Sequence, residues 1–151
     1  MTELSSASST PKKRPEFRNI NAFRDLPRYR LPAAGWVSIL HRVSGALMFF
    51  LMPFLIWMFD TSISSEISYA KFTGAFGAAG LLGLPGFFWK LVVLVLIWAF
   101  LHHFIAGVRH LWMDYSHAAV SKDFGRVSAQ ITLVSSLFAT LLLGAKLFGL
   151  Y

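Results

Sequence analysis

The sequence predicts an all-α integral membrane protein with three transmembrane helices. Of its 151 residues, 56% are hydrophobic and 14% are charged, and the mean hydropathy is +0.58. Soluble globular domains carry about 25% charged residues. Three stretches of 17, 18 and 19 residues contain no Asp, Glu, Lys or Arg: Val43 to Phe59, Leu91 to Val108 and Val127 to Ala145. Each approaches the ~20 residues that a helix needs to cross ~30 Å of hydrocarbon.

The chain before the first span divides into two parts. Residues 1–13 are rich in Ser and Thr and are expected to form a disordered cytoplasmic tail. They lack the apolar core of a secretory signal, and a mitochondrial presequence is the alternative. Residues 14–36 contain three prolines and predict an ordered, non-helical approach to the membrane. The anchor domain is therefore expected over residues 14–150, with spans at about 38–59, 87–113 and 127–148.

Lys and Arg set the expected orientation in the membrane. The first 42 residues carry eight of them, the segment from Arg109 to Arg126 carries three, and the loop from Asp60 to Lys90 carries two. Because basic flanks are retained in the cytoplasm, the N-terminus and the second loop are predicted to be cytoplasmic. The net charge of +7 suits anionic lipid headgroups or an acidic partner. Nucleic acid is a poor partner, since the basic residues flank a span instead of lining a folded domain.

Three further features describe the spans and their chemistry. Pro53 lies inside the first span and predicts a kink. The third span is expected to use its small and polar residues for helix–helix contacts: Ser128, Gln130, Thr132, Ser135, Ser136, Thr140 and Gly144. The chain has no cysteine, so any metal must be held by histidine or oxygen ligands.

The most informative stretch is residues 102–117, HHFIAGVRHLWMDYSH, which holds four of the five histidines. At about 100° per residue, one stripe of this helix carries His103, Gly107, His110 and Asp114. A neutral imidazole at the depth of His103 needs a partner, and a metal is a strong one. Gly107 leaves space for a flat macrocycle on the same stripe. We interpret His103 as a ligand of haem b, the alternative being a hydrogen bond to a neighbouring helix; His102 and His117 are expected to be incidental.

A six-coordinate haem needs a second axial ligand. If the first span enters the membrane near residue 38, His41 lies ~15 Å shallower than His103 and cannot reach the same iron. His110 and His117 share the helix or its loop with the first ligand, and His102 faces another way. A bis-histidine site would therefore need a ligand from another polypeptide.

A second polar cluster, SILHRVSG, lies where the first span enters the membrane. His41 and Arg42 can donate charge-assisted hydrogen bonds to haem propionates. Ser38 and Arg42, four residues apart on one face, can donate to the carbonyl oxygen of a quinone headgroup. The alternative is that Arg42 only anchors the helix at the interface.

These two blocks together resemble one known family. YRLPAAGWVSILHRVSG (Tyr29 to Gly45) is similar to its S-x-x-H-R-x-[ST]-G signature, and HHFIAGVRHLWMD (His102 to Asp114) to its H-x(3)-G-[VI]-R-H-[LM]-x-[MW]-D signature. The family is that of the cytochrome b556 subunits of succinate dehydrogenase, the larger hydrophobic anchors of respiratory complex II. The resemblance covers about residues 14 to 150, and Ser116 departs from it where a glycine is usual.

The resemblance implies a role for each matching position. His103 would be the axial haem ligand, His41 and Arg42 would meet the propionates, and Ser38 and Arg42 would bind ubiquinone. His110 and Asp114 would support the propionates or the cytoplasmic surface.

The resemblance also implies the partners of the chain. The second axial histidine would come from a second small anchor subunit, completing a haem-binding helical bundle. Succinate would be oxidised on a flavoprotein subunit, with electrons passing through an iron–sulfur subunit, so no residue of this chain is expected to be catalytic.

The expected location is the bacterial inner membrane, with the mitochondrial inner membrane as the alternative. A fumarate reductase anchor working in the reverse direction, and a non-redox assembly or transport subunit, are the competing functions.

Overall fold

The computed structural model describes residues 21–25, 28–78 and 80–151, so the expected disordered tail lies outside the described residues. The chain divides into two compact units, Met1–Arg30 and Leu31–Tyr151. In the first, α1 (Ala22–Asp25) forms one helical turn. The side-chain oxygen of Asn21 accepts hydrogen bonds of 3.2 Å from two backbone N–H groups of this turn. The expected non-helical approach was therefore wrong for residues 22–25.

The first span begins earlier than expected and is interrupted. α2 (Ala33–Phe50) starts directly after Pro32, whose carbonyl accepts the first backbone bonds of the helix. Residues 33–36 are thus helical, contrary to expectation, because Ala33 and Ala34 are strong helix formers and the carbonyl of Pro32 accepts the first helical bonds. α2 ends at Phe50, and after Leu51 α3 (Met52–Ile63) follows with Pro53 in its first turn. Pro53 has no N–H to continue the α2 ladder, so the predicted kink is confirmed.

The loop between the first two spans contains a helix that the sequence analysis did not predict. α4 (Glu66–Ala75) begins at a capping box in which Ser65 and Ser68 bond each other's backbone N–H groups. A tight turn follows at Gly80, where φ is +65° and a Cβ would collide with the backbone carbonyl oxygen of Leu84. The indole of Trp89 donates a 3.0 Å hydrogen bond to the carbonyl of Leu81 and so fastens this turn to the next helix.

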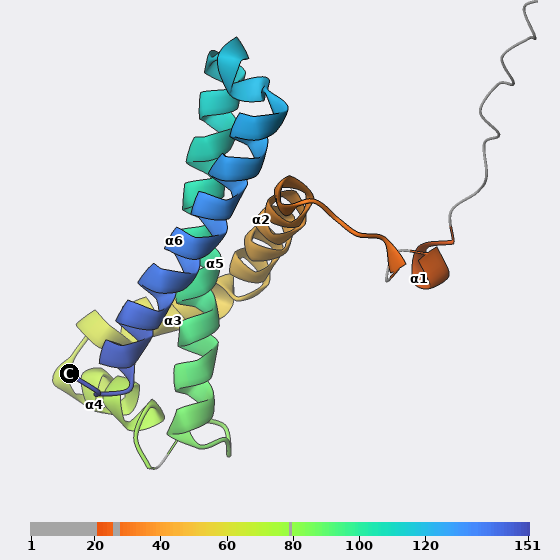
Figure 1. Ribbon diagram of the computed structural model, residues 1–151. Helices are drawn as coiled ribbons and strands as arrows, with labels where there is room; N and C mark the ends of the chain where they lie inside the picture. Colours follow the sequence, from red (N-terminus) through yellow and green to blue (C-terminus); the bar gives the residue numbers. More distant parts are fainter. Residues whose placement is uncertain (1–20, 26–27, 79) are drawn as a thin grey trace, which may run out of the picture. The chain divides into compact units, whose positions relative to one another are not determined.

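The second and third spans are long helices joined by a short connection. α5 (Gly86–Tyr115) is followed by the 3₁₀ turn η2 (His117–Val120) and then by α6 (Lys122–Leu147). α5 contacts both α2 and α6, and α2 also contacts α6. Figure 1 shows α5 and α6 running alongside each other while α2 is inclined to them. Within the described chain, α2, α5 and α6 are the three helices long and apolar enough to cross a membrane, which confirms the predicted number of spans.

The core of this unit is small and lies where the three spans meet. One fully buried residue from each span forms it: Val37, Ala106 and Ala129. α6 turns a stripe of buried small residues inward: Ala129, Thr132, Ser136, Thr140 and Gly144. The helix-contact prediction is confirmed for the last four of these, but Gln130 is exposed. Small side chains let the helix backbones approach closely, as helices in lipid do.

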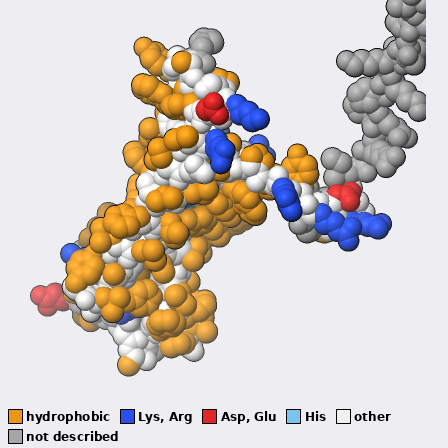
Figure 2. Space-filling view, viewed as in Figure 1, with side chains coloured by type: hydrophobic (Ala, Val, Ile, Leu, Met, Phe, Trp, Pro, Cys, Tyr) orange, Lys and Arg blue, Asp and Glu red, His pale blue; other side chains and the backbone are white. Residues whose placement is uncertain are grey.

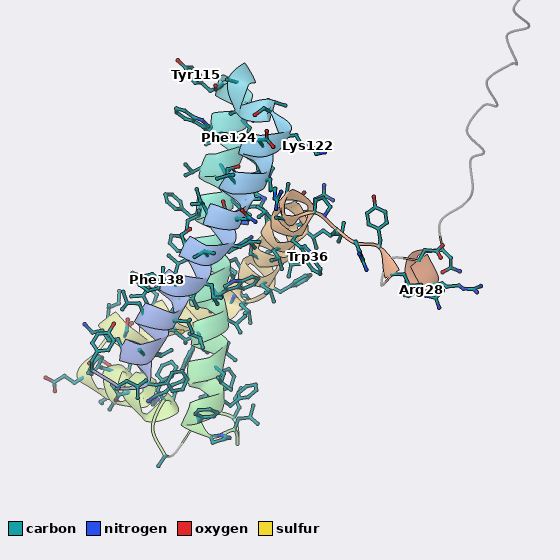
Figure 3. The ribbon with its side chains drawn as sticks, in the orientation of Figure 1. Arg28, Trp36, Tyr115, Lys122, Phe124 and Phe138 are labelled. Carbon is teal, nitrogen blue, oxygen red and sulfur yellow. The ribbon has the colours of Figure 1, made fainter. Side chains whose placement is uncertain are left out.

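The outer surface is apolar. Figure 2 shows hydrophobic side chains over the helices on the face that it presents. Exposed large side chains such as Ile131, Val134 and Phe138 follow one face of α6. In Figure 3, Phe138 points away from α6, whereas Tyr115 and Lys122 lie at the end where α5 meets α6. This surface suits hydrocarbon outside and polar groups near the interfaces.

Candidate functional site

His103 sits at the contact between α5 and α2. Its Nδ1 lies 3.0 Å from the backbone carbonyl oxygen of His41 and 3.2 Å from Oγ of Ser44. The ring is half-buried. Since a carbonyl oxygen can only accept, Nδ1 carries the ring proton and Nε2 keeps its lone pair. The imidazole is therefore held by one nitrogen while the other is available to a ligand.

His41 lies beside His103, and the expected ~15 Å offset in depth was wrong. The two ring centroids are 4.0 Å apart with planes inclined by 15°. α2 begins at Ala33, so His41 is already two turns inside the helix. The inclined crossing of α2 then brings it level with His103. The two imidazoles stack face to face, so their in-plane nitrogens do not point at one another across a common centre.

The stripe predicted on α5 also meets His41. The ring of His110 lies 5.3 Å from that of His41, inclined by 53°. At Gly107, an added Cβ would lie 3.7 Å from Nε2 of His41, an ordinary contact. The structure thus brings His41, His103 and His110 together, although no group of three or more possible metal-ligating side chains converges within the described residues. That Gly107 leaves space for a macrocycle stays a prediction.

The remaining predicted site residues lie on the same elements but are more open. Ser38 is half-buried and Arg42 is exposed, one turn apart on α2. Asp114 is exposed near the end of α5, one turn beyond His110. In the described part of the chain, no hydrogen bond joins these three side chains to the histidines. The hydroxyl of Ser38 and the guanidinium of Arg42 are donors of the kind that a polar ligand needs.

Two further residues of this site were not predicted from the sequence. Ser44 is fully buried and its hydroxyl donates a 2.9 Å hydrogen bond to the His41 carbonyl, the same oxygen that Nδ1 of His103 approaches. At Gly45, an added Cβ would lie 3.0 Å from Cε1 of His103. A signal was present, because a Ser-Gly pair inside an apolar span is typical of a close helix–helix approach.

His102 and Arg109 have structural partners on α6. His102 is fully buried and its Nδ1 lies 3.2 Å from Oγ of Ser136, so it faces away from His103 as predicted but is not incidental. Arg109 is 9% exposed. Its Nε donates to Oγ of Ser128 at 2.9 Å, and Nη2 donates to the carbonyl of Gly125 at 3.2 Å. In the sequence, Arg109 served only as one of the basic residues that predict the membrane orientation. In the structure, its guanidinium joins α5 to α6 by hydrogen bonds.

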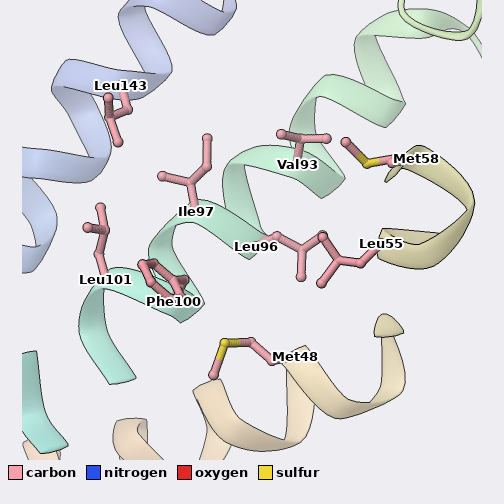
Figure 4. A pocket seen from close by; sticks show the side chains of 9 residues that line it. All are labelled: Met48, Leu55, Met58, Val93, Leu96, Ile97, Phe100, Leu101 and Leu143. Carbon is pink, nitrogen blue, oxygen red and sulfur yellow. The ribbon is translucent and has the colours of Figure 1, made fainter. Parts of the chain in front are cut away.

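An apolar pocket of about 350 Å³ lies where α2 gives way to α3. Figure 4 shows side chains from four helices around it: Met48, Leu55, Met58, Val93, Leu96, Ile97, Phe100, Leu101 and Leu143. All are hydrophobic, so the pocket suits hydrocarbon and not a charged group. Leu101 precedes His103 by two residues on α5, a spacing that turns the two side chains to different faces of the helix.

Comparison with known proteins identifies the family. The family model described as "Succinate dehydrogenase/Fumarate reductase transmembrane subunit" matches residues 11–143. The chain belongs to this family. It is similar to the succinate dehydrogenase cytochrome b556 subunit of Coxiella burnetii, with 33% identity over 120 residues, covering 80% of this chain and 90% of that protein. It is also similar to the subunit of the same name from Rickettsia felis, with 25% identity over 115 residues, covering 76% and 82%.

Membership in this family confirms the predicted resemblance. It also agrees with the fold, because the family is one of transmembrane subunits and the described chain has three apolar helices of sufficient length. The protein is therefore a membrane subunit of the succinate dehydrogenase/fumarate reductase type.

Proposed function

We propose that this chain is the anchor subunit of a succinate:quinone oxidoreductase that binds haem b through His103. The observation that carries the proposal is the fixed orientation of this imidazole. Its Nδ1 lies 3.0 Å from a carbonyl oxygen of α2, which leaves the Nε2 lone pair for iron. Histidines that ligate metals usually donate the other ring N–H to a carbonyl or carboxylate in this way. When bound, the haem would accept and pass on single electrons.

The stacked geometry supports a second ligand from another chain. His41 and His103 stack on one another at 4.0 Å, so these two imidazoles would not hold one iron between them. His110 lies two turns along the same helix as His103. We therefore assign the other axial histidine to a second small anchor subunit.

Basic groups around the histidines would hold the propionates. His41 lies between His103 and His110 in ring contact with both. Arg42, the next residue on α2, adds a guanidinium that can form charge-assisted bonds to carboxylates. Asp114 is one turn beyond His110, a spacing at which the carboxylate can orient the imidazole. These residues bind and orient, and none of them takes part in bond making.

The quinone would bind at the start of α2. Ser38 and Arg42 lie one turn apart and can donate to a carbonyl oxygen of ubiquinone. The apolar pocket beyond Leu101 offers a place of suitable chemistry for an apolar tail. Succinate oxidation would take place on a flavoprotein subunit, with an iron–sulfur subunit carrying electrons to this site.

The relatives support a direction for the reaction and a location for the protein. The family model covers both succinate dehydrogenase and fumarate reductase subunits, but both relatives described above are succinate dehydrogenase subunits. We therefore propose succinate oxidation as the direction. Both relatives come from bacteria, which supports the bacterial inner membrane, and the basic N-terminal segment supports a cytoplasmic N-terminus.

The haem ligand is tested by a pair of adjacent substitutions in the intact purified complex. His103→Leu should abolish or shift the reduced-minus-oxidised haem b spectrum. His102→Leu is the matched control, because it removes a neighbouring imidazole that faces α6, and should leave the spectrum unchanged. An unaltered spectrum in His103→Leu would remove this residue as the ligand. No haem b spectrum in the unsubstituted complex would favour the non-redox alternative.

The quinone site is tested by Ser38→Ala and Arg42→Ala. Each should lower ubiquinone reduction by succinate while oxidation of succinate by an artificial acceptor is retained. Arg126→Ala, an exposed arginine on α6, is the control and should affect neither rate. Equal loss of both activities in the α2 variants would show failed assembly in place of a quinone-binding role.

A further inference from the structure

Ser44 is a fully buried polar side chain at the crossing of α2 and α5, and the proposed function gives it no role. Buried hydroxyls in a membrane span require partners, because an unpaired polar group in hydrocarbon is costly. Ser44 has two within reach. Its Oγ lies 2.9 Å from the carbonyl oxygen of His41 and 3.2 Å from Nδ1 of His103.

The three atoms can be assigned one consistent set of donors and acceptors. The His41 carbonyl only accepts, so it takes the hydroxyl proton of Ser44 and also faces the Nδ1–H of His103. The hydroxyl hydrogen of Ser44 is then donated to the His41 carbonyl. Ser44 Oγ can therefore only accept from the Nδ1–H of His103. His103 therefore donates one proton toward two acceptors on α2, and that shared bond fixes its tautomer and ring orientation.

We infer that Ser44 is a positioning residue that sets the ring orientation and basicity of the proposed haem ligand. The inference rests on the proposed function, in which His103 binds the iron. Hydrogen-bond acceptors at the remote ring nitrogen make an imidazole a more basic ligand. A more basic ligand stabilises ferric over ferrous iron, so loss of the Ser44 acceptor raises the midpoint potential of the haem.

A purely structural role for Ser44 makes a different prediction, and the chain contains a matched control. Ser136 is also buried, also lies 3.2 Å from a histidine Nδ1, and also bonds a carbonyl three residues back on its own helix. Its histidine is His102, which faces α6. If buried Ser–His bonds only join helices, removing either hydroxyl should have the same effect.

The test is a redox titration of haem b in the intact complex carrying Ser44→Ala, Ser44→Thr or Ser136→Ala. We expect the Ala variant at 44 to have a higher midpoint potential, the Thr variant to return to the unsubstituted value because it keeps the hydroxyl, and Ser136→Ala to show no shift. An unchanged or lower potential in Ser44→Ala overturns the inference.

Two outcomes separate this inference from the function on which it rests. If His103→Leu keeps its haem spectrum, the proposed ligand fails, whatever Ser44 does. If His103→Leu loses the spectrum and Ser44→Ala has an unshifted potential, only the present inference fails. A third case is that Ser44→Ala takes up no haem. The inference about Ser44 is then supported if Ser44→Thr and Ser136→Ala both bind haem with the unsubstituted midpoint potential. It is overturned if all three variants lose haem.

Discussion

α2 presents Gly45 to the proposed ligand, and the space that a side chain would need there yields a quantitative prediction. In Gly45→Ala the new methyl would lie 3.0 Å from Cε1 and 3.3 Å from Nδ1 of His103. Contacts this short require His103 to move by a few tenths of an ångström. Because its Nδ1–H is held by acceptors on α2 at 3.0 and 3.2 Å, the movement lengthens those bonds.

The magnitude follows from two opposing effects. Alanine is favoured over glycine inside a helix by about 1 kcal/mol. Two costs oppose this gain in stability. Weakening a buried hydrogen bond costs about 1 kcal/mol, and overpacking costs about 1–3 kcal/mol. Gly74 in α4 is the matched control, since an added Cβ there meets nothing within 4 Å. We expect Gly45→Ala to be less stable than Gly74→Ala by about 2 kcal/mol, the lower end of the summed contact cost.

The assay combines thermal unfolding of the intact complex with its haem content. Gly45→Ala should unfold at a lower temperature than Gly74→Ala and retain less haem per complex, because the ligand itself is displaced. Equal unfolding temperatures and equal haem content in the two variants would refute the close approach of α2 to His103.

Three further substitutions probe how the helices are joined, each measured by thermal unfolding of the intact complex. Arg109→Ala removes both bonds of a buried guanidinium to α6 and should cost about 2 kcal/mol; a wild-type unfolding temperature would contradict the tie. Gly144→Ile should cost about 1–3 kcal/mol by overpacking, because even a Cβ there would lie 2.7 Å from Leu94, and a second change of Leu94→Ala should recover part of it. Trp89→Phe loses the 3.0 Å bond to Leu81 and should cost about 1 kcal/mol while making the turn more sensitive to protease; unchanged cleavage would contradict this.

Much of the fold could be predicted from the sequence because a segment that crosses hydrocarbon must be a long, uncharged helix. A span needs a long uncharged stretch, and three were present and are confirmed as three helices. The kink was predictable because Pro53 lacks an N–H wherever it occurs. α4 was missed because its helix signal is a capping box of two serines, Ser65 and Ser68, within an otherwise weak pattern. The start of α6 was placed too late because its first turns carry Lys122, Asp123 and Arg126, which were read as outside the helix.

The candidate site was predictable only in part. The stripe of His103 and His110 follows from the helical period of a single element, and the structure brings both near His41. The depth of His41 in the membrane depends on where α2 begins and how it is tilted. The spacing of residues along the sequence gives neither of these. Arg109 and His102 were undervalued for the same reason, since their partners are on another helix.

By itself the sequence determined that the chain crosses the membrane with three helices and that His103, His110 and Asp114 share one face. Hydropathy and the 3.6-residue period fix these properties within each segment. Only the tertiary structure decided which nitrogen of His103 is engaged, because its acceptors come from a helix about sixty residues away, at His41 and Ser44. Helix crossing brings such groups together, and a polar group buried in an apolar span must bond whatever that crossing provides.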